Sequence, residues 1–233
     1  MSSNLDYLNR VYLRIDLDKI CNNIKEVINK VGKDTKVMAV VKADAYGHGA
    51  IEVSKALSEI GTYGFAVATV GEALALRRAG ITKPILILDF VFPNQFETII
   101  RNDIMLTVFR YEIAKELNEA AEQMGTTAHI HIKVDTGMGR IGFIPDDESI
   151  DEIRRISQLP NVEIDGIFTH FACADEADKT SMNRQFAKFK DFVLRLEEIG
   201  INIPIKHVCN SAAIIDSDDK FLNMVRSGII TYG

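Results

Sequence analysis

The stretch that decides the fold is residues 36–60, which read KVMAVVKADAYGHGAIEVSKALSEI. Residues 36–41 are a short, mostly apolar run rich in valine, and residues 52–60 have helical periodicity. A run that is apolar on both of its faces is typical of a strand in a parallel sheet with both faces covered. This stretch therefore predicts a strand, a loop and a helix, which is the repeating unit of an α/β fold.

The same unit recurs along the chain. Seven further apolar runs lie at residues 64–69, 84–88, 104–108, 128–134, 164–169, 205–209 and 224–230, and helical periodicity recurs at residues 71–79, 111–124 and 183–199. Eight such units predict a closed (β/α)8 barrel of the TIM type, with a doubly wound open sheet as the alternative. We expect residues 1–233 to form a single barrel domain, in which residues 1–35 are an N-terminal strand and helix before the first barrel strand.

The composition is that of an ordinary globular protein, with 47% hydrophobic and 26% charged residues. The net charge of −6 argues against a nucleic-acid-binding surface. Cys21, Cys173 and Cys209 are widely spaced, which argues against a disulfide framework and against a metal-ligand pair. The apolar stretch at residues 84–93 is too short to span a membrane, and the first residues lack the pattern of a secretory signal. We therefore expect a cytoplasmic protein.

In a (β/α)8 barrel, the chemistry takes place at the carboxyl ends of the strands. Lys42 directly follows the first predicted strand, where partial burial would favour a neutral amine that can attack a carbonyl carbon. A lysine that extends toward solvent from a strand end is the commoner arrangement. Gly47 and Gly49 allow a tight turn after Lys42.

Two other strand ends carry charged or titratable residues. After the fifth strand, Lys133 and Asp135 are two residues apart and would share a face, and Arg140 follows two glycines and could reach back over the barrel mouth. The alternative is a strand-end salt bridge and a surface arginine. His170 follows the sixth strand, where it could act as an acid or base or could be a hydrogen-bonded structural histidine.

Small polar residues and glycines follow the last two strands, among them Asn210, Ser211 and Gly228. Barrels often bind phosphate at this place, because backbone N–H groups and a hydroxyl form an anion site there. A phosphate site near a nucleophilic lysine points to pyridoxal 5′-phosphate (PLP), which uses both.

Five segments, in this order, resemble bacterial alanine racemases. Residues 41–49 (VKADAYGHG) look like the PLP-attachment signature of that family, and residues 133–140 (KVDTGMGR) resemble its second motif. The set is completed by residues 169–172, 210–213 and 225–229. The resemblance covers nearly the whole chain. It implies a PLP-dependent racemase that interconverts L- and D-alanine and so supplies D-alanine for the cell wall.

The resemblance implies that Lys42 carries the cofactor and acts as one of two catalytic bases. One such base is needed on each face of the substrate carbon. The phosphate would be held by Tyr46, Asn210, Ser211 and the backbone of Gly228 and Ile229.

The resemblance also assigns roles around the pyridine ring. Arg226 would contact the ring nitrogen, with His207 behind it, and His170 would belong to the network that orients the opposite base. Arg140 would lie near the cofactor phenolate and the substrate carboxylate. Lys133 would orient Arg140, and in many members this lysine is carbamylated. A carbamate could pair with Arg140 as an anion, which a neutral lysine could not do.

Members of this family continue into a C-terminal β domain, which supplies a catalytic tyrosine to the partner subunit of a homodimer. This sequence ends at Gly233, and none of its six tyrosines lies in the context of that base. We therefore expect the N-terminal domain of a racemase, with little or no turnover by itself. The alternatives are a standalone PLP-binding carrier protein and a racemase of serine or another small amino acid.

Overall fold

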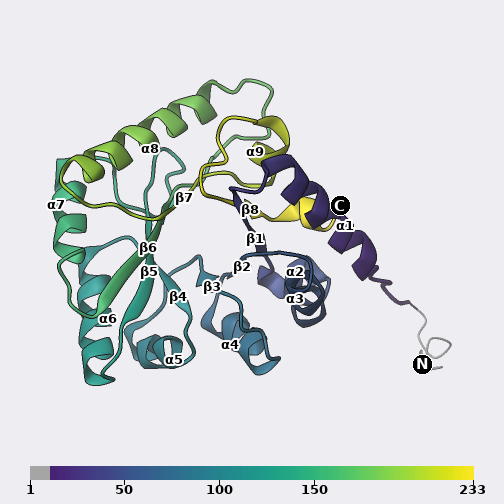
Figure 1. Cartoon of the computed structure of the whole chain (residues 1–233), viewed down its shortest axis with the longest axis horizontal. Helices are drawn as coiled ribbons and strands as arrows, with labels where there is room; N and C mark the ends of the chain where they lie inside the picture. Colours follow the sequence, from purple (N-terminus) through teal and green to yellow (C-terminus); the bar gives the residue numbers. More distant parts are fainter. Residues whose placement is uncertain (1–10) are drawn as a thin grey trace.

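Eight parallel strands close into a barrel in chain order in the computed structural model, which describes residues 11–233 (Figure 1). The strands are β1 (Lys36–Val40), β2 (Gly64–Val67), β3 (Ile85–Ile87), β4 (Met105–Val108), β5 (Ala128–Lys133), β6 (Val162–Phe168), β7 (Ile205–His207) and β8 (Met224–Ser227). The barrel closes where β1 pairs with β8, from Lys36 beside Met224 to Ala39 beside Ser227. The predicted (β/α)8 barrel is confirmed, and all eight predicted strands are present.

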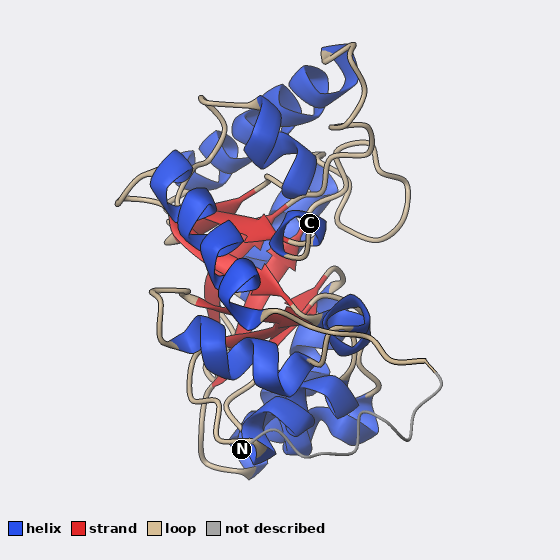
Figure 2. Cartoon of the chain, turned by 90° about the vertical axis from the view of Figure 1, so that its right-hand side faces the viewer, coloured by secondary structure: helices blue, strands red, loops and turns tan. Residues whose placement is uncertain are grey.

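Helices surround the strands, as Figure 2 shows with helices in blue outside the red strands. The α-helices are α1 (Leu17–Val31), α2 (Lys42–Gly47), α3 (Ala50–Ser58), α4 (Val70–Arg78), α5 (Phe96–Arg101), α6 (Tyr111–Gln123), α7 (Asp147–Ile156), α8 (Thr180–Glu198) and α9 (Ser211–Asp216). Two short 3₁₀ helices are η2 (Pro93–Gln95) and η3 (Ile229–Thr231). In the part of the chain that the structure describes, no helix is both long and apolar enough to cross a membrane.

The N-terminal extension contributes one helix. Asp16 caps α1 by accepting a hydrogen bond from the backbone N–H of Lys19 at 3.2 Å. The side chain of Asn23 donates to the carbonyl of Thr231 at 3.2 Å and so joins α1 to η3 at the other end of the sequence. Residues 11–16 form neither helix nor strand, and the first ten residues of the expected extension lie outside the described residues.

Alternating residues of the strands divide the core into two layers. One layer, between barrel and helices, includes Val37, Phe65 and Ile85. The other includes Met38 and Leu86, and it fills the barrel interior, because successive strand residues point to opposite faces. Burial on both faces explains why the strands read as continuous apolar runs in the sequence.

Candidate active site

A cavity of about 430 Å³ opens at the carboxyl ends of the strands. Ten of the predicted site residues line it: Lys42, Tyr46, Lys133, Arg140, His170, Asn210, Ser211, Arg226, Gly228 and Ile229. His207 is fully buried directly behind Arg226. Lys42 and Ile229, which are 187 positions apart in the sequence (229 − 42), thus meet at one end of the barrel, as barrel topology requires.

The segment after β1 is a turn of left-handed helix. Residues 43–46, none of them glycine, have φ between 52° and 55°. The left-handed conformation costs about 1–2 kcal/mol per residue, because Cβ crowds the following carbonyl oxygen. Gly47 and Gly49 follow with φ of 85° and 87°, as expected for a tight turn. The left-handed turn was not predicted, because alanine and tyrosine rarely adopt this conformation and a run of four such residues is unusual.

Contacts from three other residues hold the left-handed turn. Glu72 Oε1 accepts from the backbone N–H of Ala43 at 2.7 Å, while Glu72 also completes a capping box with Thr69 at the start of α4. Asp44 accepts from the N–H of Ala50 at 2.7 Å. The ring of Tyr232 lies 5.2 Å from that of Tyr46, and its hydroxyl donates to a carbonyl of β1. These contacts fix Lys42 and Tyr46 at the cavity wall.

Lys133 is the last residue of β5, and its side chain is almost fully buried in the barrel. Its amine donates to the carbonyls of Val134 and Ile141 at 2.9 and 3.1 Å. The pKa of Lys133 is lowered to about 8, mainly by burial; the negative charge of Asp135 opposes this change, and the positive charges of Arg226 and Arg140 contribute to it. Lys133 and Arg140 both line the cavity, and no hydrogen bond between them is present in residues 11–233.

Asp135 does not line the cavity that Lys133 lines, and it lies instead on the wall of a second cavity, with Gly137 and Lys188. Its two carboxylate oxygens accept from the backbone N–H groups of Gly137, Met138 and Arg140 at 2.8–3.0 Å. Burial alone would raise the pKa of Asp135, but these backbone hydrogen bonds bring it below its usual value. The role of Asp135 is therefore to shape the loop that carries Arg140.

Arg226 is 3% exposed and has no carboxylate partner among the described residues. Its Nη1 donates to His207 Nδ1 at 2.7 Å, and its Nη2 donates to the carbonyls of Thr169 and Val208 and to His170 Nδ1 at 3.3 Å. Burial lowers the pKa of Arg226 to about 10. The pKa of His170 is lowered to about 3, mainly by burial and to a smaller extent by the positive charge of Arg226. Both imidazoles next to Arg226 are thus neutral acceptors.

A cradle of polar and small groups lines the same cavity as Lys42. Asn210 caps α9 by accepting from the N–H of Ala213 at 3.1 Å, and Ser211 Oγ accepts from the N–H of Gly228 at 3.0 Å. A Cβ on Gly228 would lie 3.3 Å from both Ser211 Oγ and Tyr46 Oη. Glycine thus leaves the space between these two hydroxyls open, and the arrangement suits a phosphate group.

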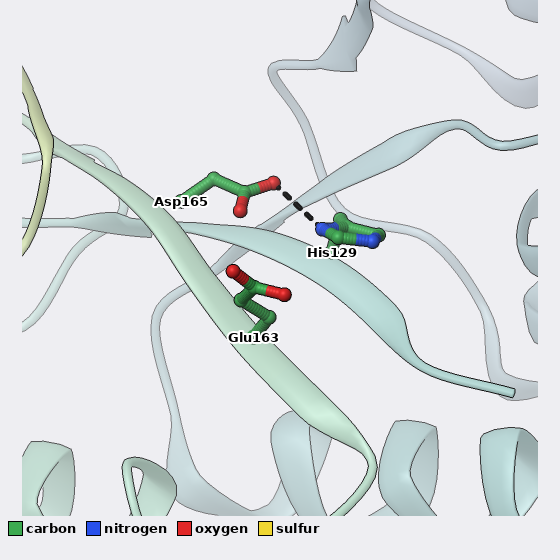
Figure 3. Close-up of side chains that lie close together, drawn as sticks. All are labelled: His129, Glu163 and Asp165. Atoms are coloured by element: carbon green, nitrogen blue, oxygen red, sulfur yellow. Dashed lines mark hydrogen bonds and ion pairs between the residues drawn. The ribbon is translucent and has the colours of Figure 1, made fainter.

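Three side chains with metal-ligating atoms lie near the amino ends of β5 and β6, away from this cavity (Figure 3). His129 Nδ1 and Asp165 Oδ2 are 2.9 Å apart, and Glu163 beside them is exposed. Burial raises the pKa of Asp165, and the charge of His129 opposes this change. Sequence analysis did not identify this group, since its members are far apart along the chain. The His129–Asp165 contact is a polar link between two neighbouring strands.

Glu72 and Gln185 also support the site and were not identified in the sequence. Glu72 had a recognisable signal, because Thr69 and Glu72 have the spacing of a capping box. Gln185 is 2% exposed on the buried face of α8, where it accepts from the N–H of Ala172 at 2.9 Å and donates to the carbonyl of His170 at 3.1 Å. Its signal was a polar residue on an otherwise apolar helix face.

Comparison with known proteins identifies the family. The family model described as alanine racemase, N-terminal domain, matches residues 15–233. The chain is 52% identical over 223 residues to the alanine racemase of Methanococcus maripaludis and 51% identical over 227 residues to that of Clostridium tetani, covering 96% and 97% of this chain. The solved alanine racemase of Clostridium difficile 630 superposes with a TM-score of 0.93 at 46% identity, over 94% of this chain and 57% of that structure.

The chain spans 60% and 58% of the lengths of the two curated relatives. The family match itself extends over almost all of the described residues, and the (β/α)8 barrel superposes on the solved structure. The chain therefore belongs to the family of alanine racemase N-terminal domains.

Proposed function

We propose that this chain is the cofactor-binding barrel of an alanine racemase, which holds PLP at Lys42 and acts on alanine. The observation that carries this proposal is the meeting of Lys42 with the cradle of Tyr46, Ser211 and Gly228 in one cavity. The cavity is large enough for a small cofactor. It is also lined by four cationic side chains, although the whole chain has a net charge of −6.

The residues present fit PLP at three points. Tyr46 Oη, Ser211 Oγ and the backbone around Gly228 suit the phosphate. The hydrogen bonds of Arg226 use Nη1 and Nη2, and no protein acceptor within residues 11–233 occupies its Nε, which leaves a donor for a ring nitrogen. Lys42 is half-buried at the cavity wall and supplies an amine for the aldehyde. When bound, the cofactor makes the substrate Cα–H acidic by delocalising charge into its ring.

The residues of this chain would then bind, orient and move protons. Lys42 Nζ would take or return the proton on one face of the substrate carbon, and Arg140 would hold the substrate carboxylate. Arg226 keeps a donor at the ring nitrogen, because a guanidinium does not give up its proton readily. The base for the opposite face would come from the partner subunit of a homodimer, as the family resemblance implies.

We also propose that Lys133 is a site of carbamylation. Only the neutral amine reacts with CO2, and a pKa of about 8 makes this form accessible near neutral pH. The reaction joins the amine nitrogen to the carbon of CO2 and releases one proton, which leaves an anion. That anion would replace the like charges of Lys133 and Arg140 with an attractive pair. Equilibration with ¹³CO2 should give a carbamate NMR signal that is absent from the Lys133→Met variant.

Attachment of PLP is tested by reduction with borohydride followed by peptide mapping. We expect the label on Lys42, and we expect Lys42→Ala to remove it while the matched surface variant Lys55→Ala retains it. A label on another lysine would contradict the site, and no visible band with PLP would contradict the proposed function.

A further inference from the structure

Behind the cavity, three buried side chains form a chain of hydrogen bonds that the reaction does not explain. Arg226 Nη1 lies 2.7 Å from His207 Nδ1, and His207 Nε2 lies 2.9 Å from His131 Nδ1. Both histidines have no exposed surface. His131 is on β5, two residues before Lys133, and it does not line the cavity.

The guanidinium of Arg226 determines which ring nitrogen of each histidine carries the proton in this series of hydrogen bonds. Arginine can only donate, so His207 Nδ1 accepts and the proton of His207 is on Nε2. That N–H donates to His131 Nδ1, and the proton of His131 is therefore also on Nε2. His131 Nε2 is buried and has no hydrogen-bond partner within residues 11–233. A buried N–H without an acceptor is costly, and an apolar side chain here would avoid this cost. The atom that justifies a histidine at this position is thus Nδ1.

The fold makes specific room for the His131 ring. Residue 166 is glycine, and a Cβ there would lie 2.4 Å from His131 Nδ1, closer than any real contact. The pairing of β5 with β6 shifts register at the same place, between Ile130 and His131. Phe168 stacks on the His207 ring at 4.6 Å with an interplanar angle of 10°. These features hold the two imidazoles in line with Arg226.

We propose that His131 is a positioning residue, whose Nδ1 fixes the tautomer and orientation of His207 and, through it, the guanidinium of Arg226 that faces the cofactor ring nitrogen. The proposal rests on the proposed function for the identity of the ring. The tautomers and the hydrogen-bond chain do not depend on it. Without an acceptor at residue 131, the Nε2–H of His207 would have no partner, and the hydrogen bond that orients Arg226 through His207 would be less well fixed.

The first test uses the protein without cofactor. Long-range ¹H–¹⁵N correlation spectra of histidine-labelled protein at pH 7 should show both His131 and His207 with the proton on Nε2. The His131→Gln variant, whose side-chain carbonyl can accept from His207, identifies the His131 signal by its loss and should leave the His207 tautomer unchanged. A proton on Nδ1 of either histidine would overturn the proposal.

The second test measures binding of pyridoxine 5′-phosphate, which has no aldehyde and therefore does not react with Lys42. The His131→Phe variant removes the acceptor and should weaken binding about tenfold, the amount typical of a lost hydrogen bond to a charged group. His131→Gln should remain within about threefold of the unaltered protein. The 1-deaza analogue, which has carbon in place of the ring nitrogen, should bind all three proteins with similar affinity.

An equal loss of both ligands in His131→Phe would show a merely structural role and would overturn the proposal. If His131→Phe does not fold, the histidine tautomers and the ligand affinity of His131→Gln still test the proposal. If the unaltered protein binds neither ligand, the proposed function fails, while the NMR spectra still test the hydrogen-bond chain by itself.

Discussion

The two halves of the barrel interior differ in chemistry. Strands β1–β4 fill it almost entirely with apolar side chains, such as Met38, Ala66 and Leu86. Strands β5–β8 add four buried titratable groups, listed from β5 to β8 as His131, Lys133, His207 and Arg226. Apolar burial stabilises a fold, whereas a buried charge without a counter-charge destabilises it. The apolar interior of β1–β4 thus stabilises the fold, whereas the buried titratable groups of β5–β8 line or support the site and lower the stability of the fold.

The largest effect should follow from acidifying the polar half. Burial lowers the pKa of His131 and of His170 to about 3, so the unfolded chain binds protons below pH 6.5 that the folded chain does not bind. Their contribution to stability is full above about pH 6.5 and is lost as the pH falls toward 3. From pH 7 to pH 5 we expect a loss of roughly 2 kcal/mol for each imidazole.

Urea unfolding at pH 7 and pH 5, followed by circular dichroism, measures this loss. The His131→Gln variant should lose roughly 2 kcal/mol less than the unaltered protein between the two values. An identical pH dependence of the unfolding free energy in the two proteins would show that His131 is not a neutral, buried imidazole in the folded protein.

In the apolar half, Leu86→Ala should destabilise the protein by about 3 kcal/mol, because it removes fully buried methyl groups and leaves a cavity. The loss should be the same at pH 7 and pH 5, since no titratable group is involved. Leu194→Ala, at a leucine that is 57% exposed, is the matched control and should change stability by less than about 0.5 kcal/mol. Similar losses in the two variants would show that the apolar interior is not the source of stability.

Replacing Lys133 by methionine should stabilise the protein by about 1–2 kcal/mol at pH 7 in CO2-free buffer, because a buried ammonium is replaced by an apolar side chain of similar length. The pKa of Lys133 is lowered to about 8, so the unaltered protein regains stability as the pH rises from 8 toward 10.5. The difference between the two proteins should therefore shrink between pH 7 and pH 9.5 in urea unfolding. A constant difference would mean that Lys133 is not charged and buried.

The smallest effect concerns the left-handed turn at the end of β1. Ala43→Gly relieves about 1–2 kcal/mol of backbone strain and adds about 0.4–1 kcal/mol of entropy to the unfolded chain, so we expect a net gain of about 0.5 kcal/mol. Ala45→Gly is the control, because its methyl group is fully buried and the variant loses that packing. A gain from Ala45→Gly that equals the gain from Ala43→Gly would mean that strain alone decides the result.

The fold could be predicted from the sequence because the barrel strands are short, mostly apolar runs that recur between segments of helical periodicity. The runs at residues 36–41 and 128–134 therefore stood out, and β1 and β5 lie within them. The short helices α5 and α9 were not predicted, since six residues give too little periodicity to recognise.

The site could be predicted only in part. Lys42 and Ser211 were found because they follow strands, and barrel topology brings strand ends together. The shared face expected for Lys133 and Asp135 was wrong, because the Asp135 carboxylate accepts hydrogen bonds from the backbone of its own loop. His131 was not identified, since its partners come from strands that are distant in the sequence. Contacts between distant segments depend on the closed barrel and have no local pattern.

The cradle of Tyr46, Ser211 and Gly228 also links the site to the order in which the chain is made. At about 5–20 residues per second, Gly228 leaves the ribosome roughly 10–40 seconds after Tyr46. The left-handed turn after Lys42 is therefore synthesised before β8, and the proposed phosphate site between the hydroxyls of Tyr46 and Ser211 is complete only once β8 has been made. A nascent or truncated chain that lacks β8 has Lys42 without the complete cradle. If this site binds PLP as proposed, tight retention of PLP would therefore report that the barrel has closed.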